Sequence, residues 1–230
     1  MKVDIIAEIG INHNGSLEKA LHMIDEVAAT GVRVCKFQHY DSLKLLGKDS
    51  PYLAYATSCQ FSKYDHEILK RHCDFVGLEY LVSIFDINDI PWADGICKRH
   101  KVASRMNTNS EFIAALISTG KEVLISTQSV APTPLPSVRY MYCVTKYPTA
   151  LEELRYLPCG PNLGLSSHCP SIAPSLKAVT QGATILENHV TFNRELPGCD
   201  QSSSITYQEL KQMVKIVRDM EAMYVKTARI

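Results

Sequence analysis

The stretch ILENHVTFNRELPGCD, residues 185–200, joins an apolar run directly to a cluster of polar groups. Glu187, Asn188 and His189 follow one another without a spacer, and a Pro-Gly turn then leads to Asp200. Polar groups at the end of a hydrophobic run either pair with one another to tolerate burial or belong to a functional site. The rest of the chain distinguishes these two interpretations.

Short apolar runs of the same kind recur along the chain. There are eight, at residues 3–10, 32–40, 79–86, 101–107, 122–129, 138–147, 162–168 and 183–190. Helical patterns lie between them: residues 16–31, 110–120 and 171–182 each start with serine and end with glycine, and a last one covers 207–224. Near-continuous apolar strands joined by helices are typical of a parallel sheet, and eight such units favour a closed (β/α)8 TIM barrel. An open doubly wound sheet is the alternative architecture.

One connection between the runs differs from the others. Only VAPTPLPS, residues 130–137, separates the fifth and sixth runs, and it contains three prolines. Proline removes a backbone donor and clashes with the preceding helical turn. We therefore predict that the barrel lacks a regular helix between strands 5 and 6. No linker or low-complexity tract interrupts the pattern, so residues 1–230 are expected to form a single domain.

The bulk composition restricts the partners of the protein. The chain has 24 basic and 24 acidic residues and no long run of one sign, which argues against nucleic acid or an anionic membrane as its main partner. The first residues do not resemble a signal peptide, and no apolar stretch is long enough to span a bilayer. The eight cysteines form no CxxC pair. We expect reduced cysteines and a cytoplasmic location.

Polar residues gather at the ends of the predicted strands, where TIM barrels carry their chemistry. Any one of them is an ordinary feature, because serines cap helices and a lone lysine or histidine is usually structural. It is less usual for all eight predicted strands to carry polar residues to the same rim of the barrel. Lys36 and Lys101 in particular lie in apolar runs, where a cation is costly without an anion beside it.

Two histidines end the seventh and eighth runs. His168 and His189 would therefore lie on neighbouring strands, close enough for both imidazoles to bind one metal ion. With oxygen ligands such as Glu8 and Asp200, they would suit a borderline divalent ion, Mn²⁺ or Zn²⁺. No local HxxxH motif supports the prediction.

Several blocks in this order resemble the sialic acid synthase family: AEIGINHNGSLEKA (7–20), VCKFQHY (34–40), KVAS (101–104), LISTQS (124–129), CVTKYPT (143–149), GLSSH (164–168) and the stretch at 185–200. The resemblance covers nearly the whole chain. It implies condensation of phosphoenolpyruvate with an N-acyl-mannosamine-type sugar to give a nonulosonic acid, the class of sialic acid, and phosphate. The partners would be these small molecules.

The resemblance also implies a role for each site residue. Those matching phosphoenolpyruvate-binding positions are Lys36, Lys101, Ser83, Ser104, Ser126 and Ser166. His168 and His189 match the metal ligands, with Mn²⁺ the first expectation and Mg²⁺ or Zn²⁺ as alternatives. Gln38, Tyr147 and Asp200 match residues around the sugar. Two glutamates join the two lysines as expected catalytic residues: Glu8, which lies in the family's first-strand motif, and Glu187, which would face the barrel mouth.

The chain departs from the family pattern at Gln128, where the family has glycine, and at two acidic positions. Met106 and Ser167 stand where the family has acidic residues, so a proton-transfer group and a carboxylate near the metal are missing. The family also carries a C-terminal antifreeze-like domain, which this chain, ending at Ile230, would need from a homodimer partner or a separately encoded domain. Two alternatives therefore stay open: another phosphoenolpyruvate-dependent aldol-type condensation, or a non-catalytic metabolite-binding barrel.

Overall fold

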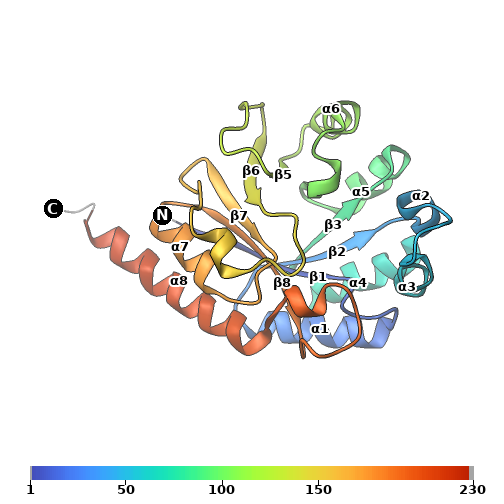
Figure 1. The fold of residues 1–230 in the computed structure, drawn as a ribbon, viewed down its shortest axis with the longest axis horizontal. Coiled ribbons are helices and arrows are strands. Elements are labelled where there is room, and N and C mark those ends of the chain that lie inside the picture. Colours follow the sequence, from blue (N-terminus) through green and yellow to red (C-terminus); the bar gives the residue numbers. More distant parts are fainter. Residues whose placement is uncertain (1, 228–230) are drawn as a thin grey trace.

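Eight parallel strands close into a barrel in the computed structural model, which describes residues 2–227 (Figure 1). The strands are β1 Asp4–Gly10, β2 Val34–His39, β3 Glu79–Ile84, β4 His100–Val102, β5 Val123–Thr127, β6 Val138–Cys143, β7 Leu163–Ser167 and β8 Ile185–Thr191. Each strand pairs with the next, and β1 pairs with both β2 and β8, which closes the ring. The predicted TIM barrel is confirmed, and the open sheet is excluded.

Helices surround the barrel. They are α1 Leu17–Ala29, α2 Ser42–Leu46, α3 Leu53–Cys59, α4 Lys63–Phe75, α5 Ile90–Ile96, α6 Ser110–Ser118, α7 Ala173–Thr180 and α8 Tyr207–Thr227. Two of them, α2 and α3, form a small core of their own with the turn after β1. The first helix has the expected ends: the Ser16 side chain accepts from the Lys19 amide, and Gly31 takes a left-handed φ of 83°. In Figure 1, α8 runs along the barrel beside α7 and α1. Among residues 2–227, no helix has the length and apolar character needed to cross a bilayer.

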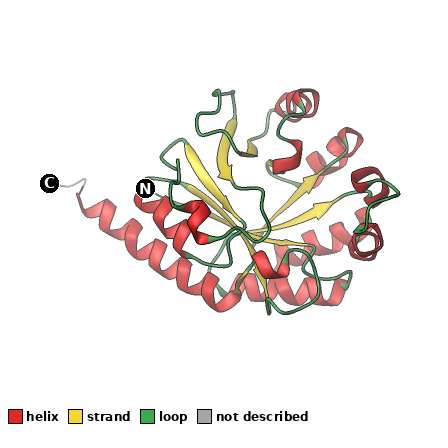
Figure 2. Ribbon diagram, viewed as in Figure 1, coloured by secondary structure: helices red, strands yellow, loops and turns green. Residues whose placement is uncertain are grey.

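The proline-containing connection between β5 and β6 has no helix in the described chain, as predicted, and Figure 2 shows it as loop. Other details were not predicted. The connection from β6 to β7 has only a 3₁₀ turn, Leu151–Leu154, and β4 is three residues long because a 3₁₀ turn begins at Ser104. A ninth strand, β9 Ile205–Thr206, adds to β8 and extends the sheet beyond the ring.

The barrel interior is layered. A floor of six apolar side chains forms a cluster separate from the outer core: Ile6, Val34, Leu81, Leu124, Met141 and Ile185. Side chains two residues apart on a strand point the same way. Two residues further along these strands come Glu8, Lys36, Ser83, Ser126, Cys143 and Glu187, all buried. The pleat therefore places a polar layer directly above an apolar floor, towards the carboxyl ends of the strands.

Candidate active site

Two lysines and two glutamates form the centre of the polar layer. Lys36 Nζ lies 2.9 Å from Glu8 Oε2 and 3.6 Å from Glu187 Oε2. Lys101 Nζ lies 3.8 Å from Glu187 Oε1. All four residues are at most 4% exposed, so neither sign of charge reaches bulk water. The two lysines in apolar strands are therefore paired with carboxylates inside the barrel, as the cost of burying a charge requires.

Serine hydroxyls extend the contacts of both lysines. Lys36 Nζ donates to Ser83 Oγ at 3.2 Å, and Lys101 Nζ donates to Ser126 Oγ at 2.8 Å. Lys101 also donates to the carbonyl of Val102 at 2.9 Å. Each ammonium group is therefore held by neutral oxygens in addition to its carboxylate.

Two further predicted serines lie beside the same layer. Ser166 donates to Glu187 Oε1 at 3.0 Å, which gives that carboxylate a neutral partner besides the lysines. Ser104 is half-buried in the turn after β4, where its hydroxyl lowers the pKa of the Cys143 thiol and partly offsets the effect of burial. The structure thus brings all the predicted phosphoenolpyruvate-binding residues to one end of the barrel.

The pKa shifts in this layer follow from burial and charge. Burial opposes the charge on Lys36, but the Glu187 and Glu8 carboxylates outweigh it and raise the Lys36 pKa. Burial lowers the pKa of Lys101, and the Lys36 ammonium adds to this effect. Burial also opposes the charge on Glu187, but the two ammonium groups hold its pKa below its usual range. Of the two lysines, Lys101 gives up a proton more readily.

An aromatic and imidazole layer lies at the mouth, above the charged groups. The ring centroids of His168 and His189 are 5.3 Å apart, so the predicted meeting of the two histidines occurs. Tyr147 stacks on His168 with centroids 3.9 Å apart and meets His189 edge-on at 6.0 Å. The hydroxyl of Tyr147 lies 2.7 Å from His168 Nε2.

The hydrogen bonds of His168 fix its tautomer. Nδ1 lies 2.8 Å from the Val144 carbonyl oxygen, which can only accept, so Nδ1 carries the proton. Burial and, to a smaller extent, the neighbouring His189 lower the pKa of His168 to about 3, which keeps the ring neutral. Nε2 therefore presents a lone pair, which accepts the Tyr147 hydroxyl. A ring nitrogen oriented by a backbone carbonyl in this way is typical of a metal ligand.

His189 offers a second nitrogen without a hydrogen-bond partner. Its Nδ1 is buried and unpaired among the described residues, 3.7 Å from Asp200 Oδ2. The two imidazoles are thus suitable ligand types for a divalent ion, and His168 is neutral, as a ligand must be. Within residues 2–227, however, histidine, cysteine, aspartate and glutamate side chains form no group of three or more that could hold a metal ion. Any ion bound here would take much of its coordination from a substrate or water.

Two of the three residues expected around the sugar, Gln38 and Asp200, meet Glu8 beside Gly10. A Cβ atom there would lie 3.3 Å from each of Asp200 Oδ2, Gln38 Nε2 and Glu8 Oε1. Gly10 has a left-handed φ of 55°, and the β1–β2 register shifts between Glu8 and Gly10. Gln38 donates to Glu8 Oε1 at 2.9 Å, which links this corner to the charged layer. The bulge and the missing side chain leave space where three polar groups meet.

The turn after β1 holds the loop that carries Asp200. Asn14 donates to the Pro197 carbonyl at 2.8 Å, and Gln201 donates to the Asn12 carbonyl at 3.0 Å. His13, in the same turn, is buried and stacks on Phe61 with centroids 4.0 Å apart. This turn is structural, and its part in the site is to position a loop from the other end of the chain.

Cys143 is a site residue that was not predicted from the sequence. Its thiol lies in the charged layer, 3.8 Å from His168 Nδ1, and burial raises its pKa to about 11. A small residue on an apolar strand looks like ordinary core, so only its spacing two residues from Met141 could have placed it inside the barrel.

The two positions at which the family's acidic residues are replaced have different surroundings. Side chains alternate in direction along a strand, so Ser167 points away from the barrel interior that Ser166 and His168 face. The Ser167 hydroxyl accepts a hydrogen bond from the Cys169 amide at 3.3 Å. It therefore lies on the outer face of β7. Met106 is half-buried and packs against the outer core. No proton-transfer group stands in place of either acid.

The chain is similar over most of its length to proteins of one family. The pattern that describes the NeuB family matches residues 23–131 and 136–228. An N,N'-diacetyllegionaminic acid synthase from Legionella pneumophila is 28% identical, covering 94% of this chain and 72% of that protein. Human N-acetylneuraminate-9-phosphate synthase is also 28% identical, covering 94% of this chain and 70% of its own. The N-acetylneuraminic acid synthetase of Leptospira borgpetersenii, crystallised with citrate, matches with a TM-score of 0.84 at 26% identity, covering 97% of this chain and 85% of that one.

Proposed function

The chain belongs to the NeuB family, and we propose that it condenses phosphoenolpyruvate with an N-acyl amino sugar of the mannosamine type. The products would be a nonulosonic acid and inorganic phosphate. Relatives are named as synthases of legionaminic acid, N-acetylneuraminate 9-phosphate or pseudaminic acid. The protein is accordingly a sialic acid synthase-like transferase of carbohydrate biosynthesis.

The buried charged layer carries this proposal. Phosphoenolpyruvate presents a phosphate and a carboxylate, and ammonium groups and hydroxyls are suitable donors to both. Lys36 and Lys101 supply the cations, and Ser83 and Ser126 already lie within hydrogen-bond distance of them. A layer of this kind at the carboxyl end of barrel strands is where TIM-barrel enzymes bind substrate.

Binding of an anion requires the two lysines to exchange partners. In the structure their charge is balanced by Glu8 and Glu187. Both carboxylates have neutral partners to retain: Gln38 donates to Glu8, and Ser166 donates to Glu187. These hydrogen bonds reduce the cost of releasing an ammonium group to the ligand.

The proposed reaction uses water as its third reactant. C3 of phosphoenolpyruvate bonds to the aldehyde carbon of the open-chain sugar, whose oxygen takes a proton. Water adds at C2, the C2–O bond to phosphate breaks, and phosphate leaves with the bridging oxygen. Lys101, with its lowered pKa, is the group we assign to proton transfer, since Met106 cannot perform it.

The mouth residues would hold the sugar. Gln38 and Asp200 converge beside Gly10, where their polar groups can meet hydroxyls, and Tyr147 lines the same mouth. His168 and His189 would hold a divalent metal, Mn²⁺ first among the candidates and Mg²⁺ or Zn²⁺ next. When bound, the metal would supply Lewis-acid polarisation of the aldehyde. Eight free cysteines are consistent with the reducing cytoplasm, which we propose as the location.

Phosphate release tests this proposal. The chain would be incubated with phosphoenolpyruvate, Mn²⁺ and each of a panel of N-acyl hexosamines, with the corresponding non-acylated aldoses as controls. The proposed function predicts phosphate release that depends on an N-acyl sugar. Release only with a non-acylated aldose would instead favour another phosphoenolpyruvate-dependent condensation. Binding of phosphoenolpyruvate without release would favour a non-catalytic barrel.

A further inference from the structure

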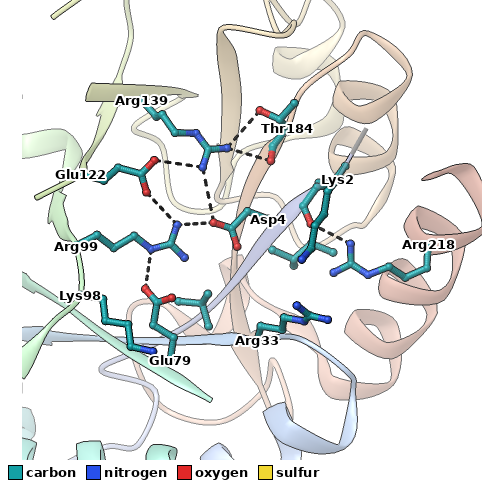
Figure 3. A pocket seen from close by; sticks show the side chains of 13 residues that line it. Lys2, Asp4, Arg33, Glu79, Lys98, Arg99, Glu122, Arg139, Thr184 and Arg218 are labelled. Atoms are coloured by element: carbon teal, nitrogen blue, oxygen red, sulfur yellow. Dashed lines mark hydrogen bonds and ion pairs between the residues drawn. The ribbon is translucent and has the colours of Figure 1, made fainter. Parts of the chain in front are cut away.

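A polar cavity lies at the end of the barrel opposite the candidate active site (Figure 3). Its lining residues stand at or just before the amino ends of the strands, including Asp4 on β1, Glu79 on β3 and Arg139 on β6. Because all the barrel strands are parallel, this end is remote from the charged layer at the carboxyl ends. We call it the amino-end cavity, and it encloses about 430 Å³.

The acidic residues of the amino-end cavity are fully engaged by two arginines. Arg99, which is 8% exposed, pairs with Asp4, with Glu79 at 2.7 Å and with Glu122 at 3.3 Å. Arg139 pairs with Asp4 at 3.8 Å and Glu122 at 3.5 Å, and donates to the carbonyl of Thr184. Figure 3 shows this network across the cavity.

The remaining cations have no acid to pair with inside the cavity. Its lining holds six basic side chains against three acidic ones: Lys2, Arg33, Lys98, Arg99, Arg139 and Arg218 against Asp4, Glu79 and Glu122. Arg218 pairs with Glu221 on its own helix. The side chains of Lys2, Arg33 and Lys98 have no ion-pair partner among the described residues.

The excess of basic over acidic side chains is a local property of this cavity. The chain as a whole has no net charge, so a basic composition does not explain six cations around one cavity. Like charges gathered in this way repel, and an anion between them removes the repulsion. Ammonium and guanidinium groups donate best to carboxylate and phosphate oxygens. The volume is that of a pocket for a small molecule.

We propose that the amino-end cavity is a second ligand site, which binds a small polyanion bearing phosphate or carboxylate groups. Lys2, Arg33 and Lys98 supply the ligand contacts. Arg99 and its three acids form a rigid base that fixes the strand ends around them. Because this site uses none of the proposed catalytic residues, it does not depend on the proposed reaction.

Tripolyphosphate is a suitable probe, and calorimetry a suitable measurement. The test variant is Arg33→Ser with Lys98→Ser, both exposed residues whose loss should leave the fold intact. The control variant is Lys48→Ser with Arg71→Ser, which removes the same charge from exposed positions away from the cavity. We expect the test variant to bind tripolyphosphate about tenfold or more weakly than the wild-type protein, and the control to bind as the wild type does.

Three results would overturn the inference. Equal affinities of all three proteins would show that the cavity cations do not bind the anion, and an equal loss in both variants would show that only total charge matters. Phosphoenolpyruvate affinity should be the same in the test variant as in the wild type. A parallel loss of phosphoenolpyruvate binding would contradict a separate site. The comparison of the two variants with tripolyphosphate remains decisive even if the proposed reaction is wrong.

Discussion

The Tyr147 hydroxyl donates a 2.7 Å hydrogen bond to His168 Nε2, the ring nitrogen of that histidine that carries no proton. The two rings stack with centroids 3.9 Å apart. The nitrogen that a metal ion would need is therefore occupied by an internal donor. Tyr147 is nevertheless 45% exposed, so its ring has room to move away from the histidine.

Substitution of Tyr147 by phenylalanine should tighten metal binding. The change removes the competing hydroxyl but retains the stacked ring, and a hydrogen bond of this kind contributes about 1 kcal/mol, or roughly fivefold in affinity. Titration with Mn²⁺, followed by the free-ion signal, measures the effect without any turnover. Tyr156→Phe, at a residue 87% exposed, is the matched control. Weaker or unchanged Mn²⁺ binding in Tyr147→Phe would argue against competition at His168.

Substitution of Glu187 by glutamine should lower stability at neutral pH and flatten its acid dependence. The carboxylate balances two buried ammonium groups, and removal of one member of such a group typically costs about 3 kcal/mol or more. Its folded-state pKa is lowered, so its stabilising contribution is complete above the ordinary carboxyl pKa of 4.5 and is lost as the pH falls below that value.

Urea unfolding at a series of pH values measures both effects. The free energy of unfolding of the wild-type protein should fall below pH 4.5 more steeply than that of the Glu187→Gln variant. Glu67→Gln, at an exposed position, should behave like the wild type. If Glu187→Gln were as stable as the wild type at pH 7, the charged layer would not be held together as described.

Of the two substrate positions in the site, loss of the Gln201 side chain should affect the sugar position and not the phosphoenolpyruvate position. Gln201 is buried, accepts from Thr191 and donates to the Asn12 carbonyl, so it holds the loop on which Asp200 lies. For Gln201→Ala we expect about 1–3 kcal/mol less stability and a higher KM for the sugar. The KM for phosphoenolpyruvate should not change.

The neighbouring substitution Ser202→Ala is the control for this loop, because Ser202 is exposed. Steady-state kinetics with each substrate varied in turn distinguishes the two halves of the site. Equal changes in both KM values would mean that the loop supports the whole mouth and not the sugar position.

Much of the barrel was predictable because strand, helix and turn signals agree locally. Apolar runs set the strands, Ser16 and Gly31 bound the first helix, and the prolines of residues 130–137 exclude a helix. The charged layer was predictable for a related reason: Lys36 and Lys101 in apolar strands can be tolerated only where carboxylates face them.

Other features depend on contacts that no local pattern encodes. β9 is two residues long, and it pairs with β8. Asn12 supports this pairing, because its side-chain amide donates to the Val190 carbonyl and to the Ser204 hydroxyl. The Tyr147–His168 hydrogen bond joins residues from separate loops. The sequence therefore could not predict that His168 Nε2 accepts a hydrogen bond from Tyr147. In the sequence, Cys143 has the character of a core residue.

Calorimetric titration with phosphoenolpyruvate tests the central claim, that the buried charged layer is its binding site. The wild-type protein should bind, Lys101→Met should bind about a hundredfold more weakly or not at all, and Lys48→Met, at an exposed unpaired lysine, should bind as the wild type does. Thermal unfolding of each variant verifies that it is folded. A folded Lys101→Met variant with wild-type affinity for phosphoenolpyruvate would contradict the account.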